Sequence, residues 1–184
     1  MPDSLGAVHM NPVPPQNGIA PAFYRDRFAA HVRRSLSMDG GEGWGAPMPT
    51  NLPNNNSGIQ AIRLADGRIA MMLNPVNASM SDQRRASLYD EIETDAMAGT
   101  GGAIWGVPRA PMALALSSDN GANFAIAAVL DQGSGVCLSN NSVEGVNKEL
   151  FYPSILQDPS GDLHVASTYH RRAIKYLRLA LPTG

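Results

Sequence analysis

Hydrophobic residues along this chain gather in short runs of strand length, and small polar turns separate the runs. Residues 59–64 and 68–73 form one pair of runs, joined by an Asp-Gly turn. Residues 152–156 and 163–169 form another pair, joined by a turn that contains Ser-Gly. Short runs bounded by Asn-Gly, Asp-Gly or Ser-Gly are the expected signature of β-hairpins. The pattern therefore predicts an all-β chain.

The runs group into three similar units, which span residues 7–50, 59–130 and 151–180. Each unit reads as a small antiparallel sheet, and a series of such sheets is typical of the blades of a β-propeller. A β-sandwich with Greek-key connections is the alternative fold. We expect a single all-β domain over residues 1–184, a partial β-propeller of about three blades.

Two of the three units contain the same turn motif, with the spacing Ser-x-Asp-x-Gly-x-x-aromatic. Its members are Ser37, Asp39, Gly41 and Trp44 in the first unit and Ser117, Asp119, Gly121 and Phe124 in the second. The Ser and Asp side chains can bond nearby backbone groups, the Gly supplies a positive φ, and the aromatic residue packs against the neighbouring strands. A sandwich gives no reason for such a repeat, so the motif favours the propeller and predicts a structural role for these residues.

One segment departs from the strand pattern. Residues 81–96 are rich in helix formers, with Ser79 or Ser81 as a cap and with Leu88 and Ile92 one helical turn apart. We predict a short helical insertion here, between the second and third strands of the second unit.

Composition excludes several functions. The formal net charge is -2 and basic residues are scattered among acidic ones, so the sequence predicts no nucleic-acid partner. No apolar run is long enough to cross a bilayer and no signal peptide is visible, so we expect no membrane partner and, by default, a cytoplasmic location. His9, His164 and His170 are too separated to form a metal site, and no phosphate-binding glycine loop occurs, so no metal and no cofactor is predicted. The single cysteine, Cys137, reads as a buried apolar side chain.

The turn motif and the order of residues around it carry a resemblance to a known family. The spacing resembles the Asp-box of sialidases and related β-propellers. The ordered set is Arg25-Asp26-Arg27, the first Asp-box, Leu52-Pro-Asn-Asn-Asn-Ser-Gly58, Arg109, the second Asp-box, Tyr152-Pro-Ser-Ile and Asp158-Pro-Ser-Gly161. This order is similar to that of bacterial sialidase-like proteins with BNR repeats, of the exo-α-sialidase (neuraminidase) type.

The resemblance implies a six-bladed propeller, of which this chain looks like the C-terminal half. Propellers close with about four to eight blades, so three blades leave the ring open. We favour truncation over the completion of the ring by further copies. An open blade flank predicts a surface for self-association.

The resemblance also implies a site. Sialidases typically hold a substrate carboxylate with three arginines and use a tyrosine nucleophile, activated by a glutamate, with an aspartate as acid/base. Tyr152 matches the nucleophile, and Glu149 is the candidate partner because Gly58 stands where the glutamate is expected. The candidate substrate-binding residues are Arg25, Arg27, Arg109, Arg172, Gln60 and Asn74. The plainer alternatives are a tyrosine that packs between blades and arginines that are surface cations or that pair with Asp26.

Three functions follow as hypotheses. The first is an exo-glycosidase of sialidase type that acts on a terminal, acidic sugar, with a carbohydrate substrate as its partner. The second is a carbohydrate-binding propeller without catalysis, which Gly58 favours. The third is a polysaccharide lyase that acts on uronic-acid sugars.

Overall fold

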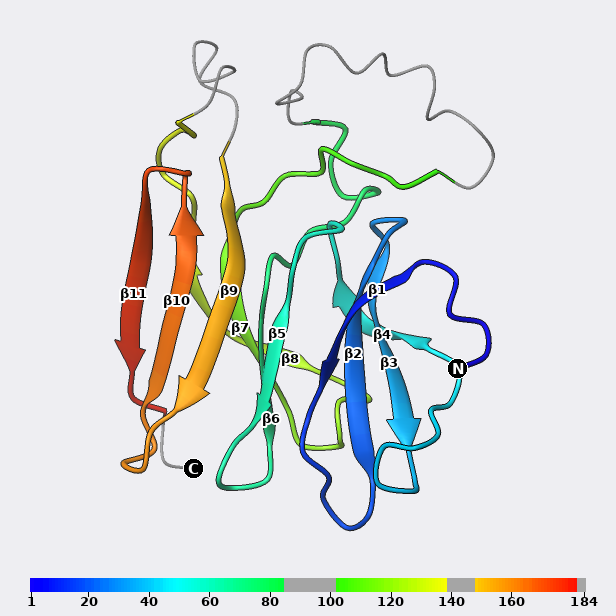
Figure 1. Ribbon diagram of the computed structural model, residues 1–184. Coiled ribbons are helices and arrows are strands. Elements are labelled where there is room, and N and C mark those ends of the chain that lie inside the picture. Colours follow the sequence, from blue (N-terminus) through cyan, green and yellow to red (C-terminus); the bar gives the residue numbers. More distant parts are fainter. Residues whose placement is uncertain (85–101, 139–147, 182–184) are drawn as a thin grey trace.

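The computed structural model describes residues 1–84, 102–138 and 148–181, and in this part of the chain it contains three antiparallel sheets (Figure 1). The first sheet has the order β1 (Ala7–Pro12), β2 (Ala20–Asp26), β3 (His31–Ser37) and β4 (Met48–Pro53). The second has the order β5 (Gln60–Arg63), β6 (Ile69–Leu73), β7 (Met112–Ser117) and β8 (Ala125–Asp131). The third has the order β9 (Leu150–Gln157), β10 (Leu163–Tyr169) and β11 (Ala173–Leu179).

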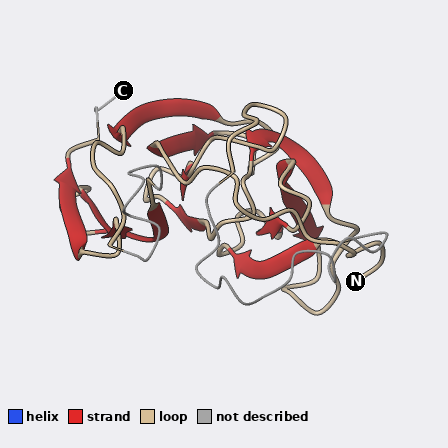
Figure 2. Cartoon of the chain, turned by 90° about the horizontal axis from the view of Figure 1, so that it is seen from above, coloured by secondary structure: helices blue, strands red, loops and turns tan. Residues whose placement is uncertain are grey.

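The all-β prediction is confirmed, and the three sheets follow one another as blades do in a propeller. Strands neighbouring in sequence are neighbours within each sheet, and the first strand of the second sheet, β5, contacts both β1 and β9. Seen from above, the strands form a row of sheets that starts at the N-terminus (Figure 2). The first strands of the three sheets, β1, β5 and β9, therefore lie next to one another. The last strands, β4, β8 and β11, form the opposite edges of the sheets.

The predicted helical insertion gains no support where it can be followed. Residues 81–84 are described and are not helical, and residues 85–96 lie outside the described part of the chain.

Two hydrophobic cores hold the sheets together, and β6 contributes to both. Met71 points into the core shared with the first sheet, beside Phe23, and Met72 points into the core shared with the third sheet, beside Val165. Side chains alternate between the two faces of a strand, so a strand between two packed sheets must be apolar at every position. All five residues of β6 are buried.

Both Asp-box motifs form the same hydrogen-bonded turn. In the second, the Ser117 hydroxyl donates to Asp119 at 2.7 Å and accepts from the Gly121 N–H at 2.9 Å. Burial acts to raise the pKa of Asp119, but hydrogen bonds from Asn123, Ser117 and the backbone outweigh it and lower the pKa to about 2. Phe124 meets Phe23 of the first sheet edge-on, with 5.6 Å between ring centroids. The motif therefore joins two sheets.

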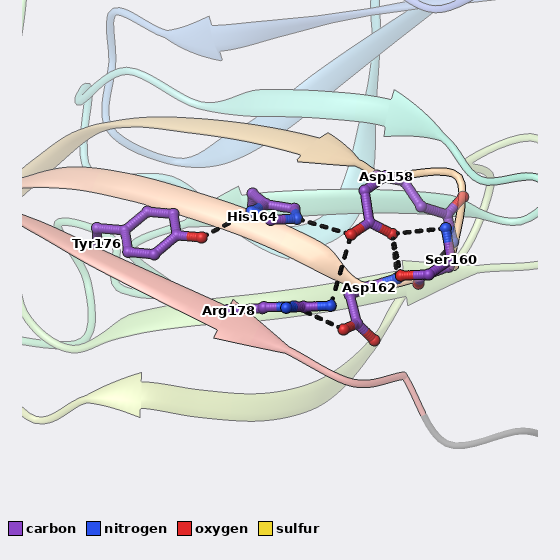
Figure 3. Close-up of polar contacts among 8 residues, drawn as sticks. Asp158, Ser160, Asp162, His164, Tyr176 and Arg178 are labelled. Atoms are coloured by element: carbon purple, nitrogen blue, oxygen red, sulfur yellow. Dashed lines mark hydrogen bonds and ion pairs between the residues drawn. The ribbon is translucent and has the colours of Figure 1, made fainter.

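The turn between β9 and β10 organises the third sheet in a similar way (Figure 3). Asp158 accepts hydrogen bonds from Ser160 and from His164 Nε2, the latter at 2.9 Å. These bonds hold the pKa of Asp158 well below its usual value. Since His164 donates through Nε2, its Nδ1 accepts from the Tyr176 hydroxyl at 2.7 Å. His164 is thus a structural residue that links the turn to β11.

The Asp-box turns lie at one edge of the sheets, and the directions of the strands place the candidate residues at the other edge. β3 and β7 both end in an Asp-box, so the ends of β2 and β6 and the starts of β7 and β9 all lie at the other edge. The residues singled out for chemistry, Arg25, Arg109 and Tyr152, gather at this second edge.

Candidate functional site

A β-bulge turns Tyr152, the predicted nucleophile, out of the third sheet. Phe151 pairs with Thr168 and Ser154 with Ala166, so two residues of β9 lie opposite one residue of β10. Tyr152 has a φ of 50° and a side chain that is 58 % exposed, whereas Phe151 is buried. Bulges re-aim side chains in this way and are common beside active sites. Within the described part of the chain, no group hydrogen-bonds to the Tyr152 hydroxyl.

Gly58 lies against the Tyr152 ring. A Cβ added to Gly58 would be 3.1 Å from Cδ1 and 3.6 Å from Cε1 of the tyrosine. The structure therefore brings together the two positions that the resemblance pairs as nucleophile and glutamate. The Tyr152 ring occupies the space that a side chain at position 58, such as the expected glutamate, would enter.

Arg109, which precedes β7, lies near both rings of the aromatic pair formed by Phe151 and Tyr152. Its guanidinium carbon is 4.8 Å from the centroid of the Phe151 ring and 5.9 Å from that of Tyr152. Both distances are within the range of cation–π contacts. Only 8 % of Arg109 is exposed, so its orientation is set by its surroundings.

Glu149 is one of those surroundings. Its carboxylate is buried, accepts a hydrogen bond from Arg171 Nε at 2.7 Å, and lies 3.9 Å from Arg109 Nη1. Burial acts to lower the pKa of Arg171, but the Glu149 carboxylate outweighs it and raises that pKa. The sequence placed Glu149 as the partner of Tyr152. In the structure it bridges two guanidinium groups, which is the geometry of a positioning residue.

Arg171, the neighbour of the predicted site residue Arg172, is the arginine of the third sheet that contacts Glu149 and Phe151. The hairpin between β10 and β11 has two central residues, His170 and Arg171, with φ values of 49° and 55°. Such a turn is ordinarily built with Asn and Gly. It directs Arg171 to Glu149 and over Phe151, at 5.3 Å, whereas Arg172 is exposed and donates to the Val136 carbonyl. Backbone strain held by non-glycine residues is concentrated at functional sites.

Arg25, at the end of β2, completes a set with one arginine from each sheet. Its Nη1 donates to the Asn56 carbonyl at 2.8 Å and to Asn56 Oδ1 at 3.1 Å. Burial lowers the pKa of Arg25, and an electrostatic interaction with the nearby Tyr152 partly offsets this. Asp26 does not pair with Arg25: its buried carboxylate accepts from two backbone N–H groups of the next turn and lies 3.3 Å from Arg33.

The remaining candidates lie around this set rather than within it. Arg27 is exposed on the turn after β2. Gln60 lines a groove of about 410 Å³ that runs between the first strands of the sheets, with Pro12 and Leu156 among its walls. Asn74 is buried, and its amide donates to the carbonyls of Arg109, Pro111 and Leu150 at 2.8–3.1 Å. Asn74 therefore anchors the segment that carries Arg109.

Two features of the site were not foreseen from the sequence. Asn55 and Asn56 donate to the carbonyls of Pro108 and Ile104, and so hold the segment 102–111 beside β2. This segment carries Trp105, which is 50 % exposed and whose ring centroid is 6.0 Å from the Arg25 guanidinium carbon. The run of three asparagines was the available signal, because consecutive amides with no strand pattern indicate a loop that bonds other backbone.

The described residues do not support metal binding, thiol chemistry or a membrane-spanning helix. No group of three or more His, Cys, Asp or Glu side chains among them could hold a metal ion. Cys137 is buried, and burial together with the neighbouring Glu149 raises its pKa to about 11, which makes it a poor nucleophile. None of the described residues belongs to a helix long and apolar enough to span a membrane.

A family model described as a BNR repeat-like domain matches residues 1–165, which is most of the chain. No sequence among the curated proteins matches the chain significantly.

Solved structures are similar in fold. The NanB sialidase of Streptococcus pneumoniae aligns with a TM-score of 0.57 and 13 % identity over 94 % of this chain and 23 % of that chain. The leech intramolecular trans-sialidase aligns with a TM-score of 0.57 and 10 % identity over 93 % and 23 %. The α-L-arabinofuranosidase Arb93A of Fusarium graminearum aligns with a TM-score of 0.54 and 11 % identity over 94 % and 44 %. This chain thus spans less than half of each of these solved chains.

Proposed function

Since the chain belongs to the family of BNR repeat-like domains, we propose that its arginine-lined edge binds a terminal acidic sugar and serves a glycoside hydrolase of sialidase type. One observation carries the proposal: each of the three sheets supplies one arginine at the same edge. Arg109 and Arg171 lie over the Phe151 ring, beside the exposed Tyr152, and Arg25 lies at the end of β2 on the same edge. The family and the sialidases among its structural neighbours support the same class of ligand.

The residues have the chemistry that this role needs. A guanidinium binds a carboxylate through two parallel hydrogen bonds, and Glu149 and Asn56 hold Arg109, Arg171 and Arg25 before any ligand arrives. Preorganised cations lose little entropy on binding. Tyr152 is the proposed nucleophile: its phenol oxygen bonds to the anomeric carbon as the glycosidic C–O bond breaks, and the phenol proton passes overall to the leaving-group oxygen. Water then attacks the anomeric carbon, breaks the tyrosyl–sugar bond, and returns one proton to the phenol. A neutral nucleophile avoids bringing an anion to an anionic substrate.

A second candidate, a carbohydrate-binding propeller without catalysis, is favoured by Gly58. A glycoside hydrolase with a tyrosine nucleophile needs a base to accept the phenol proton. At the position where that base is expected stands Gly58, which has no side chain and lies beside the Tyr152 ring. The lack of a base at position 58 would prevent turnover, whereas binding of the sugar depends on the arginines.

The test separates binding from turnover. The protein is titrated calorimetrically with N-acetylneuraminic acid and with galactose, and we expect the acidic sugar alone to bind. Equal binding of the two sugars would remove the arginines from recognition. Release of 4-methylumbelliferone from its sialoside, abolished in Tyr152→Phe but retained in the exposed Tyr176→Phe, would identify the hydrolase. Binding without product would identify the second candidate, and an unsaturated product that absorbs in the ultraviolet would identify a lyase.

A further inference from the structure

The third sheet has fewer strands than its neighbours and ends in β11. In the described part of the chain, the first two sheets have four strands each, whereas the third has three, in the order β11, β10 and β9. β11 pairs with β10 on one side and forms the outer edge of the sheet, at the left of the molecule (Figure 1). An edge strand presents a row of backbone N–H and C=O groups with which another strand can pair.

The outer strands of the first two sheets carry features that oppose such pairing, and β11 does not. β4 contains Pro49 and Pro53, which have no backbone N–H to donate. β8 is interrupted by two bulges against β7, at Ala127 and Leu130. β11 contains no proline, and all seven of its residues pair with β10 without a register shift. Among the outer strands of the described sheets, β11 therefore has the regular geometry that a partner strand needs.

The two cations of β11 are neutralised within the protein. The Lys175 ammonium donates to Asp131, and Arg178 Nε donates to Asp162 at 2.7 Å. Free lysines are a common means by which natural sheets prevent edge-to-edge pairing. Because both cations of β11 have a counter-charge close by, their repulsion of a second strand is weakened.

Two large side chains are exposed on one face of β11. Ile174 is 69 % exposed and Tyr176 is 58 % exposed. The Tyr176 hydroxyl is hydrogen-bonded to His164 of β10 at 2.7 Å, so the ring is held at the sheet surface (Figure 3). A strand that pairs with β11 would place its own side chains directly beside these two.

We propose that β11 is a homodimerisation edge, at which a second copy of this chain adds its own β11 antiparallel across a two-fold axis. A strand paired antiparallel with its own copy is symmetric, and two-fold dimers are the commonest soluble oligomers. The register centred on Tyr176 pairs all seven residues of each strand. It places Ile174 opposite Arg178 of the second copy and Lys175 opposite Leu177, so no like charges are opposed. A register centred on Lys175 or on Arg178 would oppose two cations.

A cross-link tests the register. In the proposed dimer Tyr176 lies opposite itself, and directly opposed residues of antiparallel strands have Cα atoms about 4.5–5.5 Å apart, which a disulfide can span. We therefore expect Tyr176→Cys to give a disulfide-linked dimer under mild oxidation, read on a non-reducing gel. Ile126→Cys, at an exposed position of the bulged strand β8, is the matched control and should give no linked dimer. The native Cys137 is buried.

The sign of a charge at position 174 gives a second test, read by sedimentation velocity of the 184-residue chain over a range of concentrations. The parent chain should be in equilibrium between monomer and dimer. Ile174→Lys opposes Arg178 of the second copy with a like charge, and the dissociation constant should rise at least about tenfold. Ile174→Glu opposes Arg178 with a counter-charge and should leave the dissociation constant unchanged within about threefold or lower it.

Three outcomes would overturn the inference. The first is a parent chain that sediments as a monomer at every concentration. The second is a dimer that Ile174→Lys and Ile174→Glu weaken equally, because a contact of that kind depends on an apolar residue 174 and not on its position opposite Arg178. The third is a dimer that Tyr176→Cys does not cross-link, because its interface would lie elsewhere on the chain.

Discussion

Gly58 lies beside the Tyr152 ring, and a Cβ on Gly58 would be 3.1 Å from Cδ1 of the tyrosine. The segment before β5 in the second sheet therefore lies next to the bulge of β9 in the third. We expect Gly58→Ala to displace the exposed ring and to weaken acidic-sugar binding by about threefold to tenfold. The unfolding free energy should change by less than about 0.5 kcal/mol, because an exposed ring can move away. Calorimetric titration and urea unfolding measure the two effects, and unaltered affinity would contradict this role.

Glu149 should be a source of stability through its two arginines. Glu149→Gln leaves the guanidinium groups of Arg109 and Arg171 without a buried counter-charge. Breaking a fully buried pair costs about 3–5 kcal/mol, and since Arg171 reaches solvent we expect a loss of about 2 kcal/mol. Urea unfolding measures the loss. Glu42→Gln, at an exposed position, is the matched control and should have no effect.

Arg171 and Arg172 make a matched pair of neighbours with different expected roles. Arg171→Ala removes the 2.7 Å contact with Glu149 and the cation over Phe151, and we expect acidic-sugar affinity to fall about tenfold. Arg172→Ala loses one exposed hydrogen bond to the Val136 carbonyl, and affinity should change by less than about twofold. Equal losses in the two variants would show that the effect is one of net charge alone.

Asp119 should make unfolding depend on acid. Its pKa in the folded protein is about 2, against an ordinary value of 3.8, so the ionised form is stabilised by folding. A depressed folded pKa gives stability that is present above about pH 4 and is lost as the pH falls towards 2. After discounting for the exposure of the side chain, the contribution is about 1 kcal/mol. The difference in unfolding free energy between the parent and Asp119→Asn should therefore shrink between pH 4 and pH 2, and a constant difference would contradict the assignment.

Much of the fold could be predicted because its signals are local. The residues that form the second Asp-box turn all lie within positions 117–124. Five consecutive apolar residues likewise predict that β6 is buried on both faces. Tyr152 and Arg109 were named as site residues because the resemblance to sialidase-like proteins implies a tyrosine and an arginine at these places. The predicted helical segment stays a prediction, since residues 81–84 are not helical and residues 85–96 lie outside the described part of the chain.

The sequence by itself thus determined the strands, the turns and the all-β class, since these depend on contacts between residues a few positions apart. Only the tertiary structure decided which of the candidate residues contact one another. The register shift in β9 exposes Tyr152, the strained hairpin selects Arg171 over Arg172, and burial turns Glu149 into a bridge between arginines. Trp105 joins the site only because Asn56, 49 positions away in the sequence, anchors its neighbour. These contacts form because the sheets pack against one another. Packing brings together residues that are far apart in the sequence, and no local sequence pattern predicts such pairs.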